Sequence, residues 1–316
     1  MAAKMDEFAR QRALDTYRVV DTVPEQAYDD ITRLASLICD TPIALVSLID
    51  RDRQWFKSRV GMPSPETSRD IAFCDHVIRQ PDRLMEIQDA TKDTRFAGNP
   101  LVTGDDHIRF YAGMPLVTPG GAPIGTVCVL DRTPRELSAE QREGLASLAR
   151  LTMNLMEARH REIELERAIF LDQRAGAIAA EAAPTAPPDP EANNYTVAIF
   201  EVQGIAGAIK RNGERAVTRA LAQLHEALER RLRPGSGDSV NHATASPEMI
   251  VVLHGKDTDD ALTALASYIT DFERDTSLSV LLASAKSEEP SDSPNAVFLR
   301  ADALLSQSKD QQRPLK

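Results

Sequence analysis

The sequence predicts an α+β protein in which two domains follow one another along the chain. Short apolar strands alternate with segments whose apolar residues recur three and four positions apart, the spacing of amphipathic helices. Between two such halves, residues 175–194 are rich in Ala and Pro and have no periodic apolar face, which is typical of a linker. A chain of 316 residues is long enough for two separate hydrophobic cores. We therefore expect helices packed on a sheet in each half.

The N-terminal half is expected to begin with a helix and to continue as an antiparallel sheet. Apolar residues recur at helical spacing from Tyr28 to Ile38, and Pro42 ends that pattern because proline does not continue a helix. The segment Pro119-Gly120-Gly121 is a strong turn signal between two apolar runs, so it predicts a hairpin. The expected strands cover residues 43–49, 55–60, 109–117 and 124–130.

Residues 137–174 are expected to form one long helix. Ser138 followed by Gln141 is a capping-box pattern, and no proline follows until well past Phe170. Apolar residues then alternate at spacings of three and four, the seam of a coiled coil, which Glu162 interrupts. The seam consists of Leu148, Leu151, Leu155, Ala158, Leu165 and Ile169. It fits a parallel dimer, and the alternative is a helix that packs along its own domain.

The C-terminal half, residues 195–316, alternates strands and helices. We expect strands over 196–202, 250–253 and 278–282, and helices over 205–232, 261–272 and 297–308. The order is strand, helix, one or two strands, helix, strand, helix. This order suits a ferredoxin-like or cyclase-like α/β sandwich.

Composition excludes several classes of protein. A formal net charge of −11 would repel phosphate backbones, so we expect no nucleic-acid partner. No apolar run approaches the roughly 20 residues that a membrane helix needs, and we expect a cytoplasmic protein that does not bind membranes. The cysteines Cys39, Cys74 and Cys128 are odd in number and widely spaced, which indicates free thiols in a reducing compartment.

The N-terminal half resembles the GAF family of small-molecule sensor domains. The resemblance is carried by residues 42–58, by Phe73-Cys-Asp-His76 and by Arg109-Phe-Tyr-Ala-Gly-Met-Pro115. It implies a GAF domain over residues 1–136, with an unidentified ligand between the sheet and the loops over one of its faces. Those loops would be residues 68–79 and 89–106.

Five residues are candidates for the pocket of this domain. Phe73, Cys74 and His76 belong to a dense reactive segment, whose alternative role is a helix cap with Phe73 and Cys74 packed inward. A thiol and an imidazole are two ligands where a metal site needs three or four, so we expect no metal. Arg109 and Tyr111 alternate along a strand and should face the same side. There, Arg109 could pair with an anionic ligand or with carboxylates at the rim.

The C-terminal half resembles the GGDEF family of diguanylate cyclases, with its catalytic positions altered. The family pattern places Glu201 on the first metal-binding aspartate and Gln203 on the second. The signature loop would be residues 245–249, where Pro247 takes a metal-ligand position and offers no side-chain ligand. Two Mg²⁺ ions need clustered oxygen ligands, so Glu201 and Glu248 alone are a poor substitute. The resemblance therefore implies a degenerate domain without catalytic residues.

These features predict a bacterial signal-transduction sensor. The GAF domain would bind a small molecule and regulate a catalytically inactive GGDEF-like domain, within a homodimer joined along the long helix. The C-terminal domain is a candidate for binding a protein partner, and no cofactor is identified. The alternatives are a divergent active diguanylate cyclase and a GAF-based redox sensor or enzyme that uses Cys74.

Overall fold

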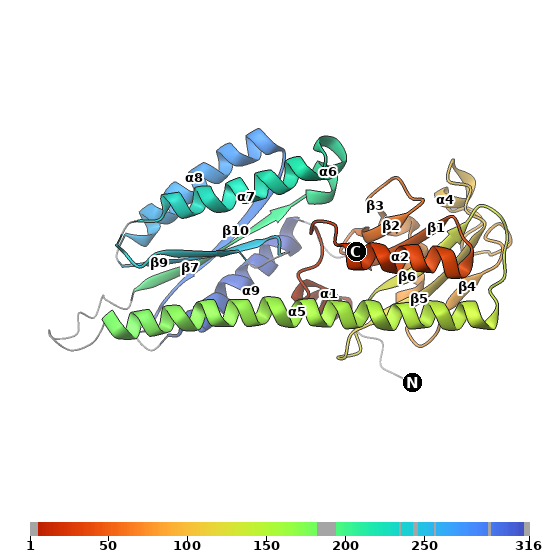
Figure 1. Ribbon diagram of the computed structural model, residues 1–316, viewed down its shortest axis with the longest axis horizontal. Coiled ribbons are helices and arrows are strands. Elements are labelled where there is room, and N and C mark those ends of the chain that lie inside the picture. The colour runs from red at the N-terminus through yellow and green to blue at the C-terminus, as the bar shows by residue number, and fades with distance from the viewer. Residues whose placement is uncertain are drawn as a thin grey trace. The chain divides into compact units, whose positions relative to one another are not determined.

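The computed structural model describes residues 6–181, 194–233, 235–242, 246–255, 257–289 and 292–312. The described residues fall into two compact units, one within 6–20 and 24–160 and the other within 21–23 and 161–312. Each unit has its own sheet with helices packed on it (Figure 1). The predicted α+β class is confirmed.

The first unit is built on a six-stranded sheet. Its strands are β1 (Ile43–Ile49), β2 (Arg53–Val60), β3 (Glu66–Ser68), β4 (Met85–Ile87), β5 (Phe110–Val117) and β6 (Pro123–Asp131). They lie in the order β3-β2-β1-β6-β5-β4, and neighbouring strands are antiparallel. The four strands expected in this half are confirmed. β3 and β4 have three residues each, too few for a recognisable sequence pattern.

Helices cover both faces of this sheet. α1 (Glu7–Thr16) and α2 (Gln26–Cys39) pack on one face, and α3 (Phe73–Ile78) packs on β5 and β6 on the other. A short 3-10 helix, η1 (Arg69–Ile71), precedes α3, and α4 (Pro100–Thr103) lies further along the chain. Ile43, Leu45 and Ile49 of β1 join the core under α3, and Ala44, Val46 and Leu48 between them are buried on the other face. Burial on both faces explains why every residue of this strand except Ser47 is apolar.

The long helix α5 covers Ala139–Glu181. Its capping box is confirmed, since Gln141 N lies 3.2 Å from Ser138 Oγ and Ser138 N lies 2.9 Å from Gln141 Oε1. The helix continues past residue 174, where the linker was expected to start, because alanine is the best helix former. The remaining linker residues, 182–193, lie outside the described residues. Of the helices in the described ranges, none has the length and apolar character to cross a membrane.

The second unit is a four-stranded sheet in the order β10-β7-β9-β8 with antiparallel neighbours. Its strands are β7 (Tyr195–Gln203), β8 (Ser239–His242), β9 (Glu248–His254) and β10 (Ser279–Lys286). Its helices are α6 (Ile205–Asn212), α7 (Glu214–Arg231), α8 (Thr258–Thr276) and α9 (Pro294–Gln312). α6, α7 and α8 share one apolar core with the sheet, while α9 and the later part of α5 share another. This is the strand order of the predicted ferredoxin-like sandwich.

The prediction of a single helix over residues 205–232 is wrong in one respect. The chain forms two helices, α6 and α7, which meet at Gly213. Gly213 has φ 82° and ψ 152°, a conformation that glycine adopts without steric cost and that ends the first helix. The apolar spacing spans the break because both helices pack on the same core.

Candidate functional site

Cys74 of α3 lies at the centre of a buried group of hydrogen-bond donors. Gln54 Nε2 and Thr126 Oγ1 each donate to Cys74 Sγ at 3.1 Å, and the Tyr111 hydroxyl donates at 3.2 Å. The Sγ of Cys128 lies 3.7 Å from that of Cys74. Thr126 and Cys128 are two residues apart on β6, so both point to the face that α3 covers. Three strands and one helix therefore converge on a single sulfur atom.

These contacts favour the thiolate form of Cys74. Burial raises the pKa of the Cys74 thiol, but hydrogen bonds from Cys128, Thr126 and Tyr111 lower it, and the pKa falls to about 7. Burial raises the pKa of Cys128, and the Cys74 sulfur beside it raises that pKa further. Burial likewise raises the pKa of Tyr111, which stays a protonated donor. One thiol of the pair can therefore ionise near neutral pH while the other stays protonated.

A small cavity adjoins this group. Its volume is about 10 Å³, room for about one water-sized molecule, and its lining includes Phe73, Cys74, Tyr111 and Cys128. The ring of Phe73 stacks on Phe96 at a centroid distance of 4.3 Å and on Tyr111 at 5.1 Å. Aromatic packing thus fills most of the space between α3 and the sheet, so in this conformation a ligand much larger than water does not fit there.

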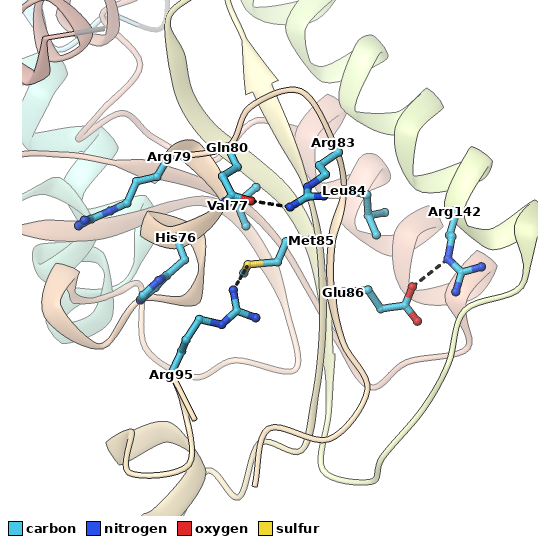
Figure 2. Close-up of a pocket in the computed structure, with 10 residues that line it drawn as sticks. All are labelled: His76, Val77, Arg79, Gln80, Arg83, Leu84, Met85, Glu86, Arg95 and Arg142. Carbon is cyan, nitrogen blue, oxygen red and sulfur yellow. Dashed lines mark hydrogen bonds and ion pairs between the residues drawn. The ribbon is translucent and has the colours of Figure 1, made fainter. Parts of the chain in front are cut away.

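A larger pocket of about 650 Å³ opens beside α3 and is rich in arginine. The charged or titratable side chains that line it are His76, Arg79, Arg83, Glu86, Arg95 and Arg142. We call it the arginine pocket. Figure 2 shows Arg95 extending toward Met85 and Arg142 extending from α5 toward Glu86. The pocket is formed within the first unit, by α3, β4, the start of α5 and the segment that contains Arg95.

Carboxylates hold three of the four arginines in place. Arg79 pairs with Asp75 of α3, Arg95 pairs with Asp93 at 2.6 Å, and Arg142 pairs with Glu86 at 2.8 Å. Of these three carboxylates, Glu86 alone lines the pocket. The charge on the pocket wall is therefore predominantly positive, in a chain that is acidic as a whole.

Arg83 and His76 differ from the paired arginines. Arg83 Nη2 donates to the amide oxygen of Gln80 at 2.9 Å, and among the described residues it has no carboxylate partner. Burial lowers the pKa of His76, while Asp75 raises it and the two nearby arginines lower it, with a net decrease. The lowered pKa favours the neutral imidazole of His76, which donates one hydrogen bond and accepts another.

The five residues predicted for the pocket do not all line either of these two pockets. Phe73, Cys74 and Tyr111 line the small cavity, and His76 lines the arginine pocket. Arg109 lines neither of these two pockets, because its Nη1 donates to the backbone oxygens of Val102 at 2.9 Å and Ile108 at 3.1 Å. It ties α4 to the start of β5. Whether any of the five binds a ligand remains a prediction.

The sequence reasoning missed the arginines and the role of Cys128. Arg79 and Arg83 lie close together before β4, a local positive cluster that the sequence does show. Arg95 and Arg142 reach the pocket from distant segments, which no local pattern indicates. Cys128 reaches Cys74 only because β6 lies under α3.

In the second unit, Glu201 and Glu248 lie directly opposite each other on β7 and β9, and both are buried. Lys309 Nζ lies 2.5 Å from Glu201 Oε2, and Gln203 Nε2 donates to Glu201 Oε1 at 3.3 Å. The carbonyl of Pro247 accepts a hydrogen bond from Val202 N at 2.9 Å. Glu248 thus belongs to a strand and not to the expected turn, because it completes the β7–β9 ladder.

Part of the expected signature loop, residues 243–245, lies outside the described residues. Within the described ranges, no three His, Cys, Asp or Glu side chains come together in an arrangement that could hold a metal ion.

Comparison with solved structures finds low similarity. The GAF domain of a phosphoenolpyruvate-protein phosphotransferase from Acinetobacter is 17% identical, with 50% of this chain and 97% of that one covered and a TM-score of 0.37. The coiled coil and GGDEF domain of DgcB from Caulobacter crescentus, in complex with c-di-GMP, is 16% identical to this chain. The match covers 54% of this chain and 96% of that one, with a TM-score of 0.36. TM-scores this low support no functional argument.

Comparison of sequences identifies the first unit. A cyclic di-GMP phosphodiesterase of Pseudomonas aeruginosa is 40% identical over 149 residues, which are 47% of this chain and 25% of the relative. The chain thus matches only a quarter of that protein. Residues 23–156 match the family model of the GAF domain, and they include β1–β6, Cys74 and the whole arginine pocket. The first unit is thus similar to the GAF domain family over residues 23–156.

Proposed function

We propose that this protein is a non-enzymatic, dimeric sensor whose GAF domain binds a small anionic molecule and thereby regulates a degenerate GGDEF-like unit. The arginine pocket carries the proposal. It offers four guanidinium groups and a neutral imidazole around one opening. Guanidinium groups bind carboxylate and phosphate oxygens through paired, charge-assisted hydrogen bonds, which makes an anion the chemical class that fits.

Arg83 is the first contact that we assign to the ligand. Its partner in the structure is a neutral amide, so an anion that binds it displaces no carboxylate. Arg95 and Arg142 keep their carboxylate partners and can share their remaining N–H groups with the ligand. His76 lies at the same opening, as expected for a residue that recognises polar groups.

For the second unit we propose a role without catalysis. Lys309 places its ammonium group on Glu201, at the position where the GGDEF resemblance expects a metal ion. Gln203 and Pro247 supply no carboxylate, so two Mg²⁺ ions would lack the oxygen ligands that they require. We assign this unit to regulation, with a protein partner as the ligand that it would bind in the cytoplasm.

The helix α5 supplies the proposed link and the proposed dimer contact. It contributes Arg142 to the arginine pocket and continues into the second unit. The seam residues Leu151, Leu165 and Ile169 are about half exposed, although they are apolar. A second copy of the helix would cover them. Binding of an anion can then shift the protein between two arrangements of the helices, if the ligand prefers one of them.

Anion binding to the purified full chain tests the proposal. Inorganic phosphate, citrate and cyclic di-GMP serve as probes in calorimetry and in thermal unfolding, because a ligand that binds the folded state raises the melting temperature. At least one probe should bind, and Arg83→Gln should weaken its binding about tenfold. The matched control is Arg33→Gln, since Arg33 is also an exposed arginine of the first unit and lies outside the pocket.

Equal loss of affinity in both variants would reject the arginine pocket as the site, as would an absence of binding to every probe. The catalytic part is tested separately by GTP turnover with Mg²⁺ or Mn²⁺. Formation of cyclic di-GMP above the level of a Glu201→Ala, Glu248→Ala double variant would establish an active cyclase instead.

A further inference from the structure

We propose that Cys74 and Cys128 form a peroxide-reactive dithiol that closes to a disulfide between α3 and β6. This inference does not depend on the arginine pocket or its ligand. It starts from the 3.7 Å that separates the two sulfur atoms. A disulfide bond is about 2.05 Å long, so the sulfurs need to approach by about 1.6 Å. A small shift of the short helix α3 on the sheet can supply that approach.

The surroundings give the two sulfurs different roles. Gln54, Thr126 and Tyr111 all donate to Cys74 Sγ, which makes it the sulfur whose thiolate is stabilised. In agreement with this geometry, the pKa of Cys74 is lowered whereas that of Cys128 is raised. Cys74 is therefore the nucleophile, and Cys128 is the thiol that resolves the product.

The size of the cavity selects the oxidant. Both cysteines are buried, and the cavity beside them has room for about one water-sized molecule. Hydrogen peroxide is the hydroperoxide closest to that size. Larger oxidants, such as lipid hydroperoxides, do not fit without a rearrangement of the aromatic core around Phe73.

The reaction is balanced with hydrogen peroxide as the oxidant. The Cys74 thiolate attacks one peroxide oxygen, an S–O bond forms, the O–O bond breaks, and the leaving hydroxide takes up a proton to become water. The Cys128 sulfur then attacks the sulfur of the sulfenic acid at Cys74, the S–S bond forms, the S–O bond breaks, and the hydroxide leaves with the proton of Cys128 as a second water. The two thiols together lose two electrons, and these electrons reduce one hydrogen peroxide molecule to two waters. A dithiol reductant restores the two thiols by thiol–disulfide exchange and is itself oxidised to a disulfide.

Cys39 provides an internal control. It is also buried, in α2 of the same unit, but burial raises the pKa of its thiol to about 11. Burial alone therefore disfavours the thiolate form of Cys39. A faster oxidation of Cys74 than of Cys39 would therefore measure the effect of the hydrogen-bond donors around Cys74.

The test is peptide mapping of the reduced full chain after exposure to hydrogen peroxide. We expect a Cys74–Cys128 cross-link in the wild type and in Cys39→Ala, and its loss on treatment with dithiothreitol. Cys74 should be oxidised at least tenfold faster than Cys39. In Cys128→Ala, dimedone should capture a sulfenic acid at Cys74, whereas in Cys74→Ala the thiol at Cys128 should survive.

Circular dichroism shows whether each variant is folded. If a variant is unfolded, the peptide map of the oxidised wild type alone tests the proposal. The proposal is overturned if the folded wild type keeps both thiols while peroxide oxidises the same thiols in urea. It is also overturned if Cys39 and Cys74 are oxidised at the same rate.

Discussion

Replacing Thr126 by valine tests how the fold stabilises the Cys74 thiolate. Valine keeps the shape of threonine but removes the hydroxyl that donates to Cys74 Sγ at 3.1 Å. A hydrogen bond to a charged group contributes roughly 1.5–3 kcal/mol, and one pKa unit corresponds to about 1.36 kcal/mol. The pKa of Cys74, about 7 in the wild type, should therefore rise by about one to two units. At neutral pH the thiolate fraction would fall from about one half to between about one tenth and one hundredth.

The same shift has a consequence for stability. The pKa of Cys74 is about 7 in the folded protein and lies near its ordinary value of 9.0 in the unfolded chain. Between these values the folded state binds fewer protons than the unfolded state. The contribution of Cys74 to stability is therefore complete above the ordinary pKa and is lost as the pH falls through about 7. Wild type should gain stability over Thr126→Val across this interval as the pH rises.

The assay is an NMR titration of protein labelled with ¹³C at the cysteine β-carbons, assigned with Cys39→Ala and Cys128→Ala. The control variant is Thr152→Val, which makes the same change at another fully buried threonine, whose hydroxyl donates to the Leu148 carbonyl. It should leave the titration of Cys74 unchanged. An identical pKa of Cys74 in wild type and Thr126→Val would refute the role that we give to the hydroxyl.

Two further predictions concern α5 and the second unit. Leu151→Asp combined with Leu165→Asp should leave the monomer folded, because both side chains are at least half exposed, and should weaken dimerisation about a thousandfold or more by placing charges in the seam. Light scattering measures this, and a wild type that is monomeric at micromolar concentration contradicts it. Lys309→Met should lower the free energy of unfolding by about 3 kcal/mol, because it leaves the buried Glu201 without its ammonium partner. Urea unfolding measures this loss, and an equal loss in the exposed control Lys210→Met would show that the pairing is not its cause.

Local sequence patterns determined most of the secondary structure. Residues 43–49 are apolar at every position but one, and both faces of β1 are buried. Ser138 and Gln141 specified the start of α5 because the capping contacts join residues three apart. Such contacts are fixed by neighbours in the chain, so they can be recognised without a tertiary structure. The break at Gly213 escaped notice because apolar spacing alone does not report the backbone conformation of one glycine.

The chemistry of the candidate sites depends on contacts between distant segments, and only the tertiary structure decided it. Cys74 was recognised in the sequence as reactive, but its donors come from β2, β5 and β6, and Cys128 is 54 residues away. The arginine pocket likewise joins α3 to Arg142 of α5. A sequence lists the side chains that can ionise or donate. The packing of α3 on the sheet decides which of these side chains donate to the Cys74 sulfur and which line the arginine pocket. Those contacts then set the pKa values and the local charge.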